Sequence, residues 1–234
     1  MSASYVCGSA ATLRNLSPED RARLDREPWV FALNKHLSHW REAGFRPSVW
    51  AWGDTERPVH VTELREQLAA LAEDPELVGR PSWCFVGLAE ERRLAELAVR
   101  EFGLENRIRF YRRQAPWAWP QAPVDSLGNL LYHTGSSLAD LANMAGILNP
   151  GQPIKLLGCP CDDSYEHFWT AAPRHAPDVA FWREVKARLW QGLAALVEQH
   201  GYTIFDCNGT EAPASVRSWI PTAPLFENEN GIAQ

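Results

Sequence analysis

Short apolar runs alternate with helix-forming segments along this chain, and this alternation limits the fold more than any other feature. The apolar runs span residues 5–8, 29–33, 47–52, 83–87, 107–111, 154–157 and 202–205. Helices are predicted over residues 14–24, 36–43, 62–73, 89–102, 136–148 and 178–199, with a last short one over 214–219. Residues 17–20 indicate a helix start, with Ser17 as cap and Pro18 at the first helical position. Strands that alternate with helices form a mostly parallel sheet with helices on both faces. We therefore predict an α/β, Rossmann-like, doubly wound fold with about seven strands.

The chain has the length of one such domain. Its 234 residues match the roughly 200–250 residues of a single α/β domain. No internal repeat or linker divides it, so we predict a single domain over residues 1–234. Two irregular stretches, residues 112–135 and 159–177, contain several prolines and aromatic residues and are candidate lid or acceptor-binding elements.

Charge and composition argue against several classes of protein. A formal net charge of -6 argues against a general nucleic-acid binder, which needs a basic surface. No apolar run approaches the roughly 18 residues that a membrane-spanning helix needs. The N-terminus shows no secretory pattern, and the five cysteines lack framework spacing, which suits a reducing compartment. We expect a cytoplasmic protein; peripheral association with the inner face of the membrane and homo-oligomer formation stay open.

The turn after the first apolar run is built from small residues. Gly8, Ser9, Ala10, Ala11 and Thr12 follow one another there. They leave room for a phosphate or a ribose to approach the backbone, and amides at the start of the helix predicted over 14–24 would point at such a ligand. The chain has no Gly-x-Gly-x-x-Gly motif, so a tight connection between strand and helix is the alternative interpretation.

Polar residues also follow several of the other predicted strands. In open parallel sheets, ligands bind beyond the carboxyl ends of the strands. This rule selects Gly8 with Ser9, Asn34, Gly53 with Asp54, residues 158–163, and Asn208. The sequence therefore predicts a ligand site at this edge of the sheet. Asn34 suits nucleotide recognition because its amide can donate and accept hydrogen bonds at once.

Four segments form a pattern that is specific only in combination. They are Val-Cys-Gly-Ser-Ala-Ala-Thr-Leu at 6–13, Phe-Ala-Leu-Asn at 31–34, Thr-Gly-Ser-Ser at 134–137 followed by residues 154–158, and the last long helix with residues 202–208. In order and spacing they resemble the bacterial lipooligosaccharide sialyltransferases and the related DUF115 (motility-associated factor) proteins. The chain departs from that family at Ser9, where asparagine is usual, and at Ala10-Ala11, where Gly-Pro is usual.

The resemblance implies a nucleotide-sugar-binding glycosyltransferase domain with a CMP-activated, sialic-acid-like donor. It implies transfer with inversion to a glycan or small-molecule acceptor, no required cofactor or metal, and a role in lipopolysaccharide biosynthesis. Ser9, Asn34 and Ser137 are carried over as donor contacts. The donor-binding set predicted around them adds Gly8, Thr12, Asp54, Thr134, Gly135 and Ser136. For Asp54, capping of the next segment is the alternative.

Inverting sialyl transfer needs a base for the acceptor proton and stabilisation of the departing phosphate. The family uses a histidine in the loop before the last long helix, and this loop holds His167 and His175. His175 is the better positional match, and histidine titrates near neutrality. Tyr165 and Arg174 are predicted to stabilise the phosphate. His133 either touches the nucleotide or makes a structural hydrogen bond.

Two other functions stay open. The DUF115 group includes pterin pyrophosphokinases that use Mg-ATP, and a chain that keeps the nucleotide fold without its base would be a non-catalytic nucleotide- or glycan-binding module. The segment Cys159-Pro160-Cys161 does not suit zinc, which usually has two residues between its cysteines and four ligands. We interpret these cysteines as ordinary thiols.

Overall fold

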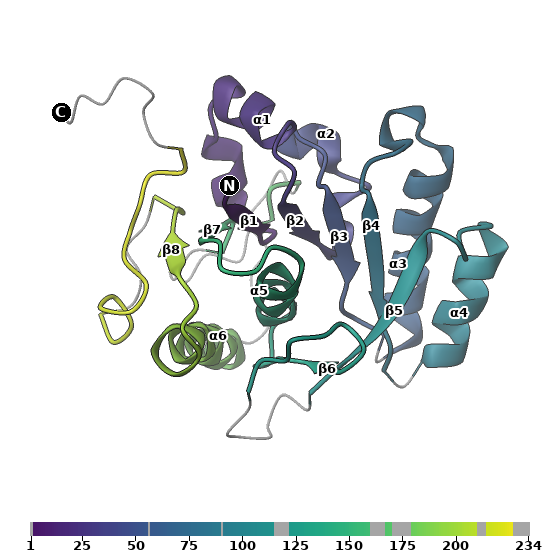
Figure 1. Cartoon of the computed structure of the whole chain (residues 1–234). Coiled ribbons are helices and arrows are strands. Elements are labelled where there is room, and N and C mark those ends of the chain that lie inside the picture. The colour runs from purple at the N-terminus through teal and green to yellow at the C-terminus, as the bar shows by residue number, and fades with distance from the viewer. Residues whose placement is uncertain are drawn as a thin grey trace.

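Eight parallel strands form the centre of the molecule. The computed structural model describes residues 2–55, 57–89, 91–114, 122–159, 167–169, 179–209 and 214–226. Within these ranges the strand order is β6-β5-β4-β3-β2-β1-β7-β8, and each strand is parallel to its neighbours. Figure 1 shows this sheet with helices on both faces. The predicted α/β, Rossmann-like, doubly wound fold is confirmed.

The strands are short and mostly buried. They are β1 Ser4–Cys7, β2 Val30–Leu33, β3 Val49–Trp52, β4 Trp83–Gly87, β5 Ile108–Arg113, β6 Leu130–Leu131, β7 Ile154–Leu157 and β8 Ile204–Asp206. Every residue of β1, β2 and β3 is buried. This is expected of nearly continuous apolar runs in a parallel sheet that is covered on both sides.

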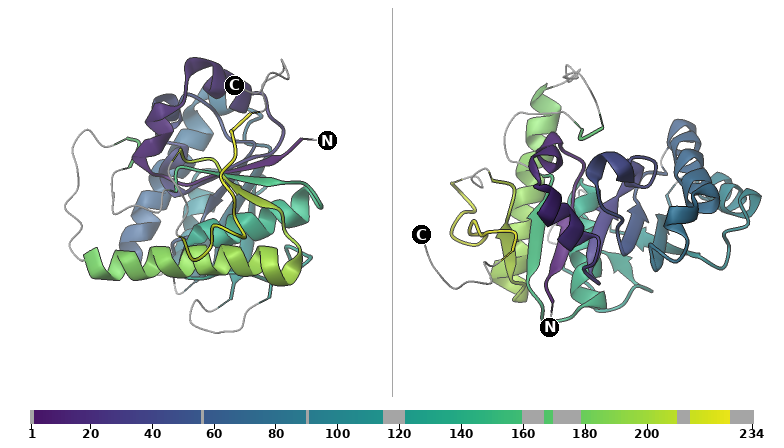
Figure 2. Two further views of the ribbon diagram at one scale, coloured as in Figure 1. Left: turned by 90° about the vertical axis from the view of Figure 1, so that its left-hand side faces the viewer. Right: turned by 90° about the horizontal axis from the view of Figure 1, so that it is seen from above.

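Two layers of helices cover the sheet (Figure 2). On one face lie α1 Pro18–Leu24, α2 Trp40–Ala43, α3 Pro58–Glu73 and α4 Arg92–Glu101; on the other lie α5 Ser137–Leu148 and α6 Val179–His200. Successive residues of β1 separate accordingly, since Val6 packs with the core under α5 and α6 and Cys7 packs with the core under α1. Among the helices described, none combines the length and the apolar character that crossing a bilayer requires.

The connection after β1 differs from the single helix predicted over residues 14–24. A 3-10 helix, η1 (Ala11–Asn15), comes first; Leu16 is extended, and α1 begins at Pro18. The helix start predicted at Ser17 and Pro18 is confirmed, because the Ser17 Oγ accepts a hydrogen bond from the Asp20 N–H at 3.0 Å and caps α1. A residue before proline disfavours helical backbone, so the helix is interrupted at this point. The N-terminal amides of α1 therefore do not follow the β1 turn directly.

Other boundaries also differ from the predictions. Residues 112–135 are not one irregular loop, because β5 continues to Arg113 and pairs there with β6, which gives eight strands rather than seven in the described ranges. Residues 36–43 hold the end of η2 (Asn34–His36) and the short α2, and a further 3-10 helix, η3 (Pro75–Leu77), follows α3. Residues 214–219 form turns rather than a helix. In the two segments predicted as loops, residues 115–121, 160–166 and 170–177 lie outside the described ranges.

The winding of the sheet changes direction between β1 and β7. From β1 the chain passes outward to β6 and then places β7 on the other side of β1. These two strands stay joined beyond their ends, since the Gly8 N–H donates to Leu157 O at 2.7 Å and the Ala10 N–H donates to Gly158 O at 2.9 Å. A Cβ atom on Gly8 would lie 2.3 Å from Gly158 O. Glycine at position 8 therefore serves this backbone contact.

We predict that Gly8→Ala lowers the free energy of unfolding by about 1–3 kcal/mol, the usual range for overpacking a close-packed site. Gly128→Ala is the matched control, because a Cβ there would meet Ser126 Oγ at an ordinary 3.6 Å. Urea unfolding of the two variants and the wild type measures the difference. Equal stability of all three proteins would contradict the tight contact between β1 and β7.

Candidate functional site

Asn34 links the ends of β2 and β3. Its Oδ1 accepts a hydrogen bond from the Gly53 N–H at 3.0 Å, and its Nδ2 donates to Asp54 Oδ2 at 2.9 Å. Asn34 adopts a left-handed backbone with φ 46, which asparagine tolerates better than most non-glycine residues. The side chain therefore turns back along the edge of the sheet and holds Gly53 and Asp54 beside it.

Two buried tryptophans of β3 support this arrangement. The Trp50 Nε1–H donates to the backbone carbonyl of Asn34 at 2.8 Å, and the Trp52 Nε1–H donates to the backbone carbonyl of Asp54. Both indole rings are almost completely buried. Each buried indole N–H thus has a hydrogen-bond partner at the carboxyl edge, and these bonds hold the backbones of Asn34 and Asp54 in place.

The N-terminus of α5 approaches the same point. A Cβ atom on Gly53 would lie 2.1 Å from Ser137 Oγ, so the first residue of α5 packs directly on the backbone that follows β3. Gly135 supplies the left-handed turn with φ 86, and the Ser136 Oγ caps the helix by accepting from the Leu138 N–H at 3.3 Å. Thr134 packs elsewhere, against Gly192 of α6.

A buried group of polar side chains lies under this N-terminus. Asp140, on α5, is fully buried; its Oδ2 accepts from the Tyr111 hydroxyl at 3.1 Å and its Oδ1 lies 2.7 Å from His133 Nδ1. An Arg113 guanidinium nitrogen lies 3.8 Å from Asp140 Oδ2 and 3.4 Å from Ser137 Oγ. Asp140 therefore fixes a histidine, a tyrosine and an arginine beside the predicted donor contact Ser137.

The charges of this group also affect the pKa of Asp54. Burial raises the pKa of Asp54 above its usual value, and Asp140 adds to the rise, while Arg113, His60 and His133 oppose it. Burial likewise holds the pKa of Tyr111 far above its usual value, with Asp140 acting in the same direction. A carboxyl with a perturbed pKa among groups of this kind is a frequent property of functional sites.

A separate set of contacts anchors residues 167–169 on the turn after β1. His167 pairs with Ala10 as an antiparallel bridge, the Phe168 N–H donates to Ser9 O at 3.0 Å, and His167 Nδ1 lies 3.1 Å from Ser9 Oγ. Arg14, on η1, donates to the backbone carbonyls of Phe168 at 2.9 Å and His167 at 2.8 Å. These bonds hold residues 167–169 on the β1 turn.

Three stacked rings continue this anchor toward α2. The rings of His167 and Trp169 are 4.5 Å apart with an interplanar angle of 6°, and those of Trp169 and His39 are 4.9 Å apart at 8°. Phe168, between them in sequence, is buried and packs against His36. The imidazole of His167 is thus oriented both by Ser9 and by an indole face.

The chemistry open to Ser9 and His167 is limited by their backbone. A hydroxyl beside an imidazole is the geometry of an activated nucleophile, but acyl transfer also needs amides that bind an oxyanion. The Ala10 N–H is already used by Gly158 O, and the Phe168 N–H by Ser9 O. We therefore interpret the contact between Ser9 and His167 as one that holds the histidine at the edge of the sheet.

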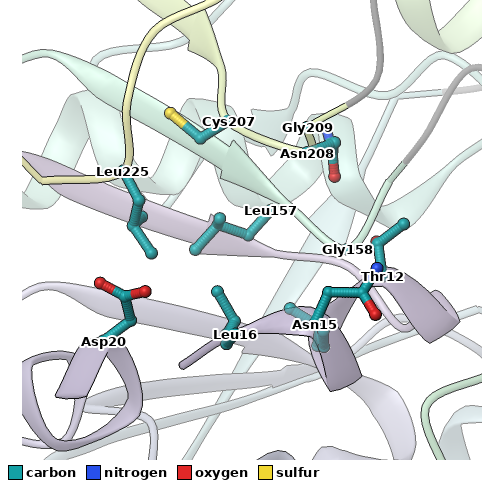
Figure 3. Close-up of a pocket in the computed structure, with 11 residues that line it drawn as sticks. Thr12, Asn15, Leu16, Asp20, Leu157, Gly158, Cys207, Asn208, Gly209 and Leu225 are labelled. Atoms are coloured by element: carbon teal, nitrogen blue, oxygen red, sulfur yellow. The ribbon is translucent and has the colours of Figure 1, made fainter. Parts of the chain in front are cut away.

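A small cavity opens on the other side of the β1 turn (Figure 3). It measures about 220 Å³ and lies between η1, α1 and the carboxyl ends of β7 and β8. Leu16, Leu157 and Leu225 surround one part, and Thr12, Asn15 and Asn208 surround the other. Asn34, Asp54 and Ser137 do not line it. Thr12 therefore lines a cavity that the other donor-binding candidates do not line.

Asn208 has a structural role beside that cavity. Its Oδ1 accepts from the Cys159 N–H at 2.8 Å, and its Nδ2 donates to Asp206 Oδ1 at 2.6 Å. Burial raises the pKa of the Cys159 thiol to about 12, so the thiol stays protonated near neutral pH. In the described ranges no group of three or more metal-ligating side chains gathers.

The predicted site residues thus fall into three places. Asn34, Asp54 and Ser137 come together around Gly53; Ser9 meets His167; Thr12 lines the cavity. Tyr165, Arg174 and His175 lie outside the described ranges.

Four residues of this group were not among the site residues predicted from the sequence: Tyr111, Arg113, His60 and Asp140. One signal was available for Asp140: it is the one acid within the apolar run 138–142 of a buried helix. A carboxyl in that position must find partners.

We predict that Asp54→Asn stabilises the protein at pH 7. The folded protein binds the Asp54 proton more tightly than the unfolded chain does, because the pKa is raised from its usual 3.8. The free energy of unfolding therefore falls as pH rises from the unfolded pKa through the folded one. Asparagine removes this loss, and its advantage disappears in acid below the unfolded pKa.

Urea unfolding between pH 3 and pH 8 tests this expectation. Asp125→Asn, at an exposed position, is the control and is expected to match the wild type throughout. An Asp54→Asn variant that is less stable than the wild type at pH 7 would contradict the burial effect.

Comparison with known proteins yields no relative on which to rest an assignment. No protein-family model matches the sequence. Neither a curated protein nor a solved structure matches it.

Proposed function

We propose that the protein is a glycosyltransferase that binds a CMP-activated, sialic-acid-like sugar at the carboxyl edge of β2 and β3 and transfers the sugar with inversion to a glycan or small acceptor. The observation that carries the proposal is the meeting of three distant segments at Gly53. Asn34 accepts a hydrogen bond from the Gly53 N–H, and Ser137 packs on Gly53. Both residues belong to motifs that resemble the sialyltransferase family.

The polar groups around Gly53 suit a nucleoside monophosphate. An amide at position 34 and a hydroxyl at position 137 offer both acceptors and donors for ribose and base. Arg113 and the N-terminus of the twelve-residue helix α5 provide positive potential beside them. Such potential favours a phosphate and the charge that develops on it when the sugar leaves.

The sheet order supports the same choice. Doubly wound sheets bind ligands beyond the carboxyl ends of their strands, close to the point where the winding reverses. That point lies between β1 and β7, and here the backbones of Gly8 and Gly158 are in direct contact. On the β1 side of this point, the ends of β2 and β3 carry Asn34 and Asp54.

We predict that CMP stabilises the protein without magnesium. At about 100 times the dissociation constant a ligand adds about 2.7 kcal/mol, which corresponds to about 5–10 °C in Tm for a chain of this size. The measurement is a thermal-shift series with CMP, CDP, UDP and ATP, each with and without magnesium. Stabilisation only by ATP with magnesium would favour the pyrophosphokinase alternative, and no stabilisation by any of them would contradict a nucleotide site.

We also predict that Ser137→Ala weakens CMP binding about two- to tenfold, since one net hydrogen bond contributes about 0.5–1.5 kcal/mol. Thr62→Ala, at an exposed position on α3, is the control. Calorimetric titration with CMP gives both dissociation constants. Equal affinity of the Ser137 and Thr62 variants would move the nucleotide away from α5.

A further inference from the structure

We propose that Asp54 is the group that accepts the proton of the acceptor hydroxyl, in place of the loop histidine that the resemblance implies. This inference rests on the proposed glycosyl transfer and assigns a catalytic role within the same site. Three observations support it: the fixed position of the carboxyl, the charges that face it, and the different surroundings of His167.

The position of Asp54 is fixed from several elements. Its Oδ2 accepts from Asn34 at 2.9 Å, and its backbone carbonyl accepts from the Trp52 indole. The next residue, Thr55, donates its hydroxyl to Gly87 O at 2.7 Å and accepts from the Glu91 N–H at 2.9 Å. A base whose backbone and one oxygen are held in this way stays in one orientation.

The second oxygen of Asp54 is left for a ligand. Within the described ranges, the bond from Asn34 is the one hydrogen bond to this carboxylate. The residue is only partly buried, at the edge where Ser137 and Gly53 meet. An acceptor hydroxyl at this edge can donate to Oδ1 without displacing the bond from Asn34.

Charged groups face Asp54 from four elements or their ends. They are Arg113 at the end of β5, His60 on α3, His133 before α5, and Asp140 on α5. Asp140 is engaged by Tyr111, His133 and Arg113, so its negative charge is matched locally. Burial is the largest effect on Asp54 and raises its pKa above the usual value, and a carboxylate with a raised pKa is a stronger base.

His167 has a different environment. Its Nδ1 is paired with Ser9, its ring is stacked on Trp169, and its backbone carbonyl is held by Arg14. These contacts join residues 167–169 to the β1 turn and to η1. We infer that His167 positions this segment.

The step is a single displacement. The acceptor oxygen forms a bond to the anomeric carbon of the sugar while its proton passes to Asp54 Oδ1. The bond from that carbon to the phosphate oxygen breaks, and the electron pair leaves with CMP. Asp54 ends neutral, and the proton later returns to water.

The test measures CMP release from CMP-N-acetylneuraminic acid with water as the acceptor, and CMP binding in parallel. Asp54→Asn keeps an oxygen for the bond from Asn34 and removes the base. We expect kcat to fall by about 100-fold or more, as for loss of a general base, with CMP affinity within about threefold of the wild type. Asp125→Asn is expected to match the wild type, and His167→Ala and His175→Ala are expected to lose less than Asp54→Asn.

The pH profile and chemical rescue complete the test. The wild-type rate is expected to rise with pH as Asp54 ionises; Asp54→Asn loses this limb, and formate restores CMP release to Asp54→Ala. If Asp54→Asn stays within threefold of the wild type while either histidine variant loses 100-fold, the assignment of the base is wrong and the transferase proposal stands. If the wild type neither binds CMP nor releases it, both proposals are overturned.

Discussion

The side chain of Asn34 is the contact on which the candidate site depends. It satisfies the Gly53 amide and gives Asp54 its hydrogen bond, so one amide sets the spacing between the ends of β2 and β3. To reach both, the Asn34 backbone takes a left-handed conformation with φ 46. Non-glycine residues in this conformation carry strain that the surroundings must offset, and such residues cluster at functional sites. Here the Trp50 indole holds the strained carbonyl in place.

A second asparagine, Asn208, also links two strand ends but has different partners. Asn208 joins β7 to β8 much as Asn34 joins β2 to β3, but it binds the Cys159 amide and Asp206, and its partners are strand ends alone. Asn34 instead holds a carboxyl against which α5 and Arg113 converge. The carboxyl edge of the sheet therefore has two halves. At β1, β7 and β8 the strand ends are hydrogen-bonded to one another, and at β2 and β3 titratable side chains gather around Asp54.

The sequence predicts the fold well because strands that are buried on both faces of a parallel sheet consist of nearly continuous apolar residues. Seven of the eight described strands follow from such runs, whereas β6 has two residues, too few to show a pattern. The break between η1 and α1 was visible as Ser17 before Pro18, although the residues on either side suit a helix. Local pattern thus specifies each element, and its ends depend on caps and prolines that override the pattern.

The site was only partly predictable, because its members meet through tertiary structure. Asn34, Asp54 and Ser137 could be selected since each follows a strand or begins a helix. Arg113 lies in a run of arginines that suits a solvated strand edge equally well, and only the pairing of β5 with its neighbours brings it to Asp140. The role of His133 likewise depends on Asp140, seven residues away on a helix whose orientation the sequence does not give.

Asp140, which is fully buried, and Asp54, which is partly buried, differ in the charge that the fold requires. Asp140 binds a tyrosine, a histidine and an arginine, so removing its charge would leave buried partners unmatched. Among the described residues, the carboxylate of Asp54 receives one hydrogen bond, from a neutral amide, and an asparagine in its place could accept the same bond. The cost of burying the charge of Asp54 outweighs its attraction to Arg113, so folding loses stability by carrying this charge. What the carboxylate adds at this edge of the sheet is the capacity to bind a proton, which is a chemical property rather than a structural one.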